Sequence, residues 1–387
     1  MKILYKPIAL AALFFTTISL TAFTKPPKFS KKKVTINTNP RIQVAILLDV
    51  SNSMDGLIEQ AKAQLWNMVS TMGKAECNGI APKIEIALYE YGRSSNDVKD
   101  GYVKQINGFT GDLDQVSKNL FSLTTNGGDE FCGHVMFTSL KDLNWDSSSL
   151  NYKVIFISGN EDFLQGDIHY TKACAIAKSK GVIVNTIYCG DKMQGISEHW
   201  NLGAECGGGS FTNINQDAKT IEIPTPYDSV LYSLNGRLNG TYIAYGYAGK
   251  ASYAKQAEVD QLNVGLSSGA GLKRIAVKGN SKLYNNASWD AVDAYKMDEK
   301  AIDKVDIKTL PDSLQKKSRE EIKKIVADKS KERGQIQKDI EKLNTQREAY
   351  IAAEKAKNAV KNNNATLETE VEKMIKVQAK RYNMIIQ

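Results

Sequence analysis

Short apolar runs alternate with helical patterns over the first half of the chain, from Ile42 to about Gln216. The apolar runs are nearly unbroken and are bounded by polar or glycine-rich turns, which is typical of strands buried on both faces. This alternation predicts an α/β fold with a doubly wound, mostly parallel sheet that is covered by helices. The predicted strands cover residues 42–48, 84–89, 154–157 and 182–188, with a weaker strand at 210–214.

The segments between these strands carry apolar residues at helical spacing and are expected to cover the sheet. In such a sheet, ligands bind at the carboxyl ends of the strands, so the functional residues are expected in the loops after Leu48, Tyr89 and Ile157. The apolar stripes are Leu57, Ala61, Leu65 and Met68, then Leu113, Val116, Leu120 and Leu123, and later Ala173, Ile176 and Ala177.

The character of the sequence changes after residue 218. Residues 219–309 mix helical stripes with turn signals and Gly-, Ser- and Asn-rich stretches. Residues 310–387 are rich in Lys and Glu and nearly free of Pro and Gly, and their apolar residues approximate a heptad seam. They predict a charged helical, coiled-coil-like region, which either folds back as a hairpin at Asn362–Asn364 or forms a single extended helix.

The N-terminus has the pattern of an export signal, with a basic start, an apolar run from Ile8 to Phe23 and a polar exit. Residues 1–24 are expected to be a signal peptide and residues 25–40 a basic linker. The protein is therefore expected in the periplasm, in the cell envelope or outside the cell. An uncleaved membrane anchor is the alternative, because the cleavage site is poor. Lys31–Lys33 is expected to be a solvated part of the mature N-terminus, and association with an anionic envelope surface is the alternative.

Composition argues against several functional classes. The 387 residues favour two folded units, and the formal net charge of +8 is dispersed, so nucleic-acid binding is not expected. The three histidines, His134, His169 and His199, have no metal-ligand spacing and complete no nucleophilic triad. Gly207–Gly209 lacks the Lys-Ser/Thr of a phosphate loop. The sequence therefore predicts a protein that is not an enzyme.

Five cysteines lie in a chain that is expected to be exported, so pairing is permitted and one thiol must be left over. Cys174 lies in a predicted helix and Cys189 ends the following strand, which favours a bond between them. Cys77 and Cys132 lie in predicted loops and are expected to form the second pair. The alternative is that all five are unpaired buried thiols.

The candidate chemistry lies where the first strand meets the first helix, at Asp49, Ser51 and Ser53, in the pattern Asp-x-Ser-x-Ser. One carboxylate and two hydroxyls offer only hard oxygen donors, which suit Mg²⁺ and also Mn²⁺ or Ca²⁺. The alternative is that Asp49 ends a strand and one of the serines caps the helix.

With this motif after an apolar strand, residues 41–218 resemble a von Willebrand factor A domain, and Asp49, Ser51 and Ser53 match the first loop of its metal-ion-dependent adhesion site (MIDAS). The resemblance implies that a Thr from a second loop and an Asp from a third complete the site. It also implies that a protein ligand supplies an acidic residue to the metal. Thr125 is the first second-loop candidate, and Asp129, which follows Gly127-Gly128, is the other.

The third loop departs from the family pattern, because Gly159 or Asn160 stands where an Asp is common. Glu161, or Asp162, could supply an oxygen instead. The sequence thus predicts a metal-dependent adhesion or assembly module at the cell envelope, with the C-terminal region available to partner helices. The alternative is a metal-free scaffold that acts through its C-terminal helices.

Overall fold

The computed structural model describes residues 37–387 apart from residues 216, 218–221, 358–365 and 387. The predicted signal peptide, 1–24, and most of the predicted linker, 25–40, lie outside the described residues. So do the asparagines at which a hairpin turn was expected.

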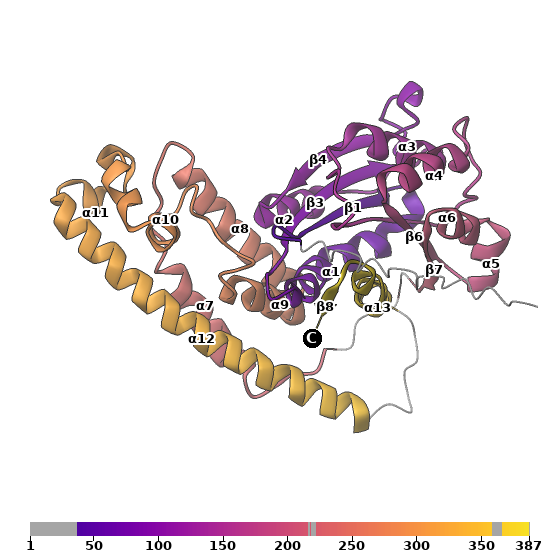
Figure 1. The fold of residues 1–387 in the computed structure, drawn as a ribbon. Helices are drawn as coiled ribbons and strands as arrows, with labels where there is room; N and C mark the ends of the chain where they lie inside the picture. Colours follow the sequence, from indigo (N-terminus) through magenta and orange to yellow (C-terminus); the bar gives the residue numbers. More distant parts are fainter. Residues whose placement is uncertain (1–36, 216, 218–221, 358–365, 387) are drawn as a thin grey trace, which may run out of the picture. The chain divides into compact units, whose positions relative to one another are not determined.

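A six-stranded sheet has the order β4-β3-β1-β5-β6-β7 (Figure 1). Five of its strands are parallel, and β4 runs antiparallel to β3 at one edge. The predicted doubly wound, mostly parallel sheet is therefore confirmed. The strands are β1 (Arg41–Asp49), β3 (Lys83–Tyr91), β4 (Lys104–Thr110), β5 (Tyr152–Gly159), β6 (Ile183–Cys189) and β7 (Gly208–Ile214).

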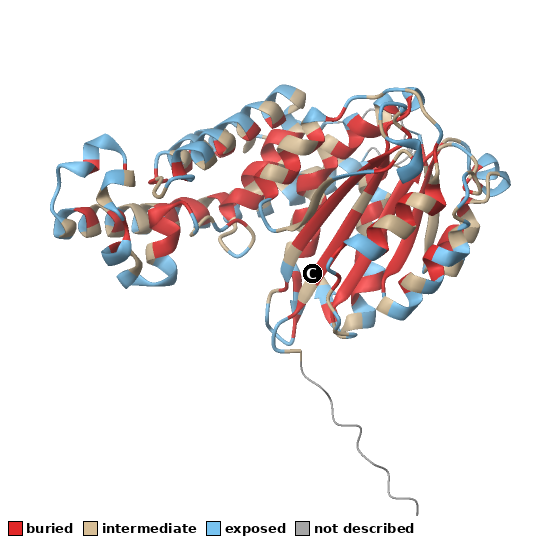
Figure 2. Cartoon of the chain, turned by 90° about the horizontal axis from the view of Figure 1, so that it is seen from above, coloured by how far each residue is buried: buried red, intermediate tan, exposed pale blue. Residues whose placement is uncertain are grey.

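Helices cover both faces of this sheet, and the strands between them are mostly buried (Figure 2). The first face carries α1 (Asp55–Gly73) and α2 (Leu113–Ser122), whose apolar stripes pack on Val44 and other β1 residues. The second face carries α3 (Cys132–Asp142), α4 (Tyr170–Lys180) and α6 (Trp200–Cys206), and α5 (Lys192–Ser197) follows β6. Burial on both faces explains why the parallel strands read as continuous apolar runs.

A helical region follows β7 and shares the core of the first face. A buried ion cluster joins this region to α2. In it, Arg274 donates to Asp114 of α2 at 2.7 Å and to Asp260 of the helical region itself at 2.5 Å. Its helices are α7 (Asp228–Asn239), α8 (Gly249–Leu266), α9 (Ser268–Gly279), α10 (Ala291–Met297), α11 (Asp312–Gln315) and α12 (Arg319–Lys357), with short 3₁₀ helices at Glu299–Lys304 and Ile307–Thr309.

The apolar seam predicted in the C-terminal region is largely buried within this chain. Ile336 and Ile340 of α12 are fully buried and pack in the shared core. Helix α13 (Leu367–Ala379) is a separate helix that packs against α1 and the sheet. A 3₁₀ helix (Lys380–Tyr382) follows it, and β8 (Met384–Ile386) then pairs antiparallel with β2 (Ala75–Cys77).

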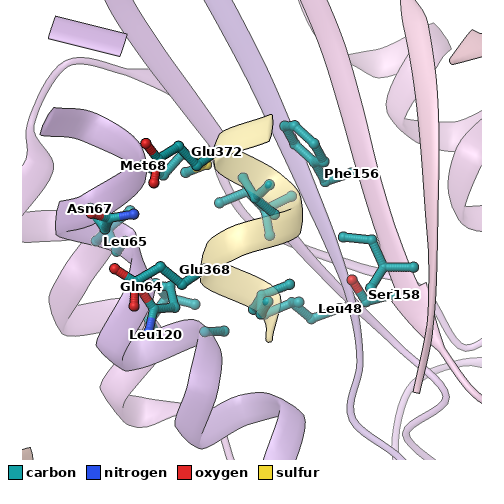
Figure 3. Close-up of a pocket in the computed structure, with 15 residues that line it drawn as sticks. Leu48, Gln64, Leu65, Asn67, Met68, Leu120, Phe156, Ser158, Glu368 and Glu372 are labelled. Carbon is teal, nitrogen blue, oxygen red and sulfur yellow. The ribbon is translucent and has the colours of Figure 1, made fainter. Parts of the chain in front are cut away.

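Helix α13 therefore completes the cover of the first face, although it lies at the far end of the sequence. Figure 3 shows it between α1 and the strands that carry Leu48, Phe156 and Ser158. The buried Gln378 side chain accepts from the Tyr152 hydroxyl at 2.9 Å and exchanges hydrogen bonds with Asn185 at 2.6 and 3.1 Å. A cavity of about 50 Å³ remains between α13, α1 and the sheet.

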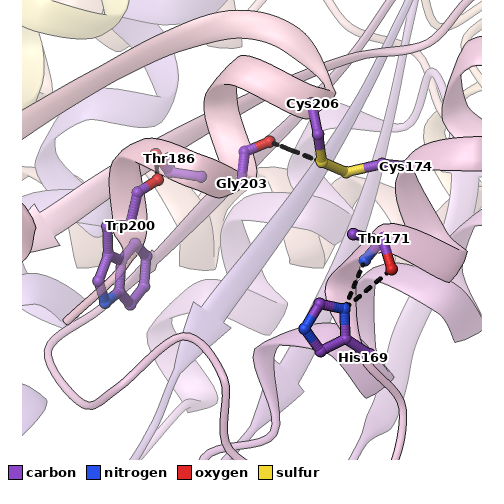
Figure 4. Close-up of a disulfide and its surroundings, with 7 residues drawn as sticks. All are labelled: His169, Thr171, Cys174, Thr186, Trp200, Gly203 and Cys206. Atoms are coloured by element: carbon purple, nitrogen blue, oxygen red, sulfur yellow. Dashed lines mark hydrogen bonds between the residues drawn. A yellow bond between two sulfur atoms is a disulfide. The ribbon is translucent and has the colours of Figure 1, made fainter.

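The predicted disulfide pairs, Cys77 with Cys132 and Cys174 with Cys189, are wrong. Cys174 of α4 is bonded to Cys206 at the end of α6 (Figure 4). The other three cysteines are buried free thiols. The physical reason is that the two members of each predicted pair lie in different cores. Cys189 and Cys77 belong to the core of the first face, and Cys174 and Cys132 belong to that of the second.

No helix among the described residues is both long enough and apolar enough to cross a membrane.

Candidate cation site

Asp49 is the last residue of β1, so its side chain stands at the carboxyl edge of the sheet. It is completely buried, and the Ser51 backbone N–H donates to its Oδ1 at 2.8 Å. A 3₁₀ helix, Asn52–Met54, follows, and α1 begins with Met54 as its N-cap. Ser51 makes no side-chain capping bond; its Oγ lies 3.2 Å from Ser53 Oγ. The first loop thus gathers one carboxylate and two hydroxyls.

The second loop contributes a carboxylate that the sequence did not single out, Glu130. Its side chain is buried, with 5% of the residue exposed, and Asp49 and Ser51 are among the groups that shift its pKa. The neighbouring Asp129 is exposed. Thr125 donates from its hydroxyl to Asp55 Oδ1 at 2.5 Å, so it ties the second loop to the start of α1.

Burial and mutual repulsion perturb these two carboxyl groups. Burial raises the pKa of Asp49 above its ordinary value, although its hydrogen bonds oppose the shift. Burial, followed by the contact with Asp49, raises the pKa of Glu130 to about 10. The pair therefore holds a proton at neutral pH when no cation is bound. Asp49 Oδ2 and Glu130 Oε2 are both buried without a hydrogen-bond partner.

The third loop shows why a carboxylate is missing at Gly159. The hydroxyl of buried Tyr91 donates to the Ser158 carbonyl oxygen at 3.0 Å and fills the space beside Gly159. A Cβ atom on Gly159 would lie 2.5 Å from the Tyr91 hydroxyl oxygen and 3.0 Å from Asp49 Oδ2. A side chain at Gly159 is therefore incompatible with Tyr91 in this position.

The remaining third-loop candidates lie at the rim. Glu161 is exposed, yet it is near enough to raise the pKa of both Asp49 and Glu130. Its backbone is fixed, because the Trp200 indole N–H donates to the Glu161 carbonyl at 2.8 Å. Asp162 contacts the His199 ring at 2.9 Å, so its carboxylate is held away by the segment before α6.

These residues fit a hard divalent cation. Asp49 and Glu130 each have one buried oxygen without a hydrogen-bond partner, and among the described residues neither forms an ion pair with Lys or Arg. A cation could take the place of the proton that the pair holds and neutralise its charge. Mg²⁺ needs few protein ligands, because it keeps several waters. Among the described residues, no group of three or more His, Cys, Asp or Glu is placed so that it could hold a metal ion.

Sequence reasoning missed Glu130 because adjacent residues of an extended segment point to opposite sides. The Gly127-Gly128 pair identified the loop, but nothing local distinguishes which of the following acids turns inward. The one available signal is that Glu130 directly precedes Phe131 and the buried start of α3.

No family model matches the sequence, and a comparison with curated proteins gives no match. Solved structures that resemble the chain include proximal thread matrix protein 1 from the mussel byssus, with 13% identity over 47% of this chain and 44% of that chain and a TM-score of 0.35. Another crystal of that protein has a zinc-occupied MIDAS motif, with 12% identity over 46% of this chain and 43% of that one and a TM-score of 0.35.

A von Willebrand factor type A structure from Catenulispora acidiphila has 12% identity over 46% of this chain and 39% of that chain, with a TM-score of 0.34. An aerotolerance-related membrane protein from Bacteroides fragilis has 13% identity over 57% of this chain and 99% of that chain, with a TM-score of 0.32. This chain spans less than half the length of the mussel and Catenulispora proteins.

Proposed function

We propose that this chain, which contains a von Willebrand factor A-type domain, holds a divalent cation at Asp49 and Glu130 and uses it to bind an acidic group of a protein partner. Three features support an A-type domain. The doubly wound sheet, its single antiparallel edge strand and the Asp-x-Ser-x-Ser loop at the end of β1 occur together.

The observation that carries the proposal is the pair of buried carboxyl groups, each with one oxygen that has no partner. An unpartnered buried polar atom costs about 1–3 kcal/mol, and an uncompensated charge costs more. Coordination of a cation by both oxygens would offset this cost. The Ser51 hydroxyl and water would complete the coordination, and a water site open to the solvent would receive the partner's carboxylate.

A binding role suits these residues better than catalysis. The groups near the cation are carboxyls, hydroxyls and the Tyr91 phenol, whose pKa burial raises well above its ordinary value. Tyr91 is therefore a poor acid or base at neutral pH. Export also belongs to this proposal, because a disulfide such as Cys174–Cys206 is typical of oxidising compartments.

The metal-free scaffold remains a second candidate, because Asp49 and Glu130 can satisfy each other by sharing a proton. The last turns of α12, from Glu341 to Lys357, contain no buried residue and could receive partner helices or other protein surfaces. This candidate predicts no response to divalent cations.

Thermal unfolding with Mg²⁺, Mn²⁺ or Ca²⁺ against EDTA separates the two. A bound cation should raise the melting temperature, with a gain of about 2.7 kcal/mol at a hundredfold excess over Kd. Ser51→Ala should weaken the response, whereas Asp129→Asn, an exposed neighbour of Glu130, should retain it. An unchanged melting temperature with every cation at millimolar concentration would refute the cation site.

A further inference from the structure

The loops around the cation site carry an excess of negative charge, although the whole chain has a formal net charge of +8. We call residues 50–55, 92–103, 123–131, 160–169 and 190–199 the edge loops, because they lie at the carboxyl ends of the parallel strands. Exposed bases there are Lys99 and Lys192, whereas the exposed acids include Asp97, Asp100, Asp129, Glu161, Asp167 and Asp191.

Backbone contacts confirm that these loops meet. The Asn126 N–H donates to the Val50 carbonyl at 2.8 Å, and the Ser94 N–H donates to the Gly127 carbonyl at 2.8 Å. In the strand order, β3 is next to β1 on one side, and β6 is two strands away on the other. With about 4.8 Å between neighbouring strands, the ends of β3 and β6 lie about 5 and 10 Å from the end of β1, which carries Asp49.

The edge loops also carry exposed apolar side chains. Val98, in the loop after β3, is 57% exposed, and Met193 and Ile196, in the loop after β6, are 69% and 37% exposed. Because β3 and β6 lie on opposite sides of β1 in the sheet, apolar side chains accompany the acids in loops on both sides of the strand that carries Asp49. Apolar contacts beside a polar centre are typical of protein interfaces.

We propose that the edge loops are a docking surface for a basic protein segment, which presents a single carboxylate to the cation and surrounds it with Lys or Arg and apolar side chains. This inference rests on the proposed cation site. The unpartnered oxygens of buried Asp49 and Glu130 fix where the contact is centred. The exposed acids then decide the partner, because they repel a uniformly acidic segment and attract a basic one.

Three synthetic peptides test this docking surface by fluorescence anisotropy in millimolar Mg²⁺. The first alternates Lys and Leu around a central Asp, the second replaces the Asp by Asn, and the third replaces every Lys by Ser. The first peptide should bind at least about tenfold more tightly than either control. Its affinity should fall as salt is raised, since exposed charges are screened.

A triple variant, Asp97→Asn, Asp100→Asn and Asp167→Asn, removes exposed charge without touching the cation pair. It should weaken binding of the basic peptide by about tenfold and leave the cation-induced rise in melting temperature unchanged. A matched variant removes three exposed acids elsewhere, by Glu76→Gln, Glu299→Gln and Glu320→Gln, and should bind like the unmodified protein.

The outcomes distinguish the docking surface from the cation site. If the cation raises the melting temperature but the Ser-flanked peptide binds as well as the basic one, the docking surface is refuted and the cation site stands. Equal binding of the Asp and Asn peptides would refute the central carboxylate. Absence of any cation effect on the melting temperature overturns both proposals.

Discussion

Replacing Glu130 by Gln should make the cation-free protein more stable and the cation-bound protein less so. In the cation-free state, burial and then the contact with Asp49 raise the pKa of Glu130 to about 10, so the folded protein at pH 8 keeps a proton that the unfolded chain releases. Gln is isosteric with Glu, is neutral, and can donate an amide N–H to Asp49. Gln has no such protonation cost, so stability should rise by about 1–3 kcal/mol, the range for relieving an unfavourable buried polar group. At roughly 2 °C per kcal/mol for a chain of this size, the melting temperature should rise by about 2–6 °C.

The same substitution removes one of the two buried carboxylates that would hold the cation. The unmodified protein should gain about 2.7 kcal/mol at a hundredfold excess of cation over Kd, and Glu130→Gln should lose most of this gain. The two effects have opposite signs, so general damage to the fold cannot imitate them.

The assay is thermal unfolding of both proteins at about pH 8, in EDTA and in a series of Mg²⁺ and Mn²⁺ concentrations. Asp129→Asn is the matched control, because it removes a carboxylate from the adjacent, exposed position of the same loop. It should change neither the stability in EDTA nor the cation response. A Glu130→Gln protein that keeps the full cation response would show that Glu130 does not contribute to the site.

In EDTA, stability should fall as pH rises from about 6 to 9, because the raised pKa of Glu130, about 10, means that the folded protein keeps a proton that the unfolded chain releases near 4.5. The free energy of unfolding should fall by at most about 1.4 kcal/mol per pH unit, and saturating Mg²⁺ should make the melting temperature nearly independent of pH. If Glu130→Gln shows the same pH dependence in EDTA as the unmodified protein, the assignment to Glu130 is contradicted. Ile375→Ala in α13 should cost about 2–5 kcal/mol in urea unfolding, because Ile375 is fully buried, whereas Val377→Ala, at a 56% exposed position of the same helix, should cost little. Mass spectrometry of the non-reduced protein should find a peptide that links Cys174 to Cys206, with the other three cysteines alkylated only after unfolding; a different linkage would contradict the packing of α4 on α6.

The parallel strands could be predicted from the sequence because burial on both faces leaves nearly unbroken apolar runs. The run at 42–48 became β1 (Arg41–Asp49), and the run at 182–188 became β6 (Ile183–Cys189). Strand β4 was missed, because it is a polar, half-exposed edge strand with irregular register. Its residues, Lys104–Thr110, carry neither the unbroken nor the alternating apolar signal.

The role of the last twenty residues could not be predicted from local patterns. The stripe of Leu367, Val371, Met374 and Ile375 indicates a helix with one buried face, and α13 has that face. A stripe does not say which surface it covers, because that depends on contacts between residues far apart in sequence. Gln378, whose partners are Tyr152 and Asn185, shows the separation involved.

The candidate site was predictable where the chemistry is local and unpredictable where it depends on packing. Asp49 and Ser51 are brought together by a strand end and a turn, so their spacing alone pointed to them. Two features depend instead on the space around Tyr91 and Asp49. They are the inward orientation of Glu130 and the absence of an acid at Gly159.

The two buried acids of the site come from the first and second loops. With Tyr91 beside Gly159, the second buried acid comes from the second loop, and the third loop offers only the exposed Glu161. The negative charge is therefore concentrated on the Asp49–Glu130 side. Glu161 is exposed and near enough to raise the pKa of both buried acids, so it adds to this negative charge. This negative charge repels a partner carboxylate, so basic groups next to that carboxylate should strengthen binding.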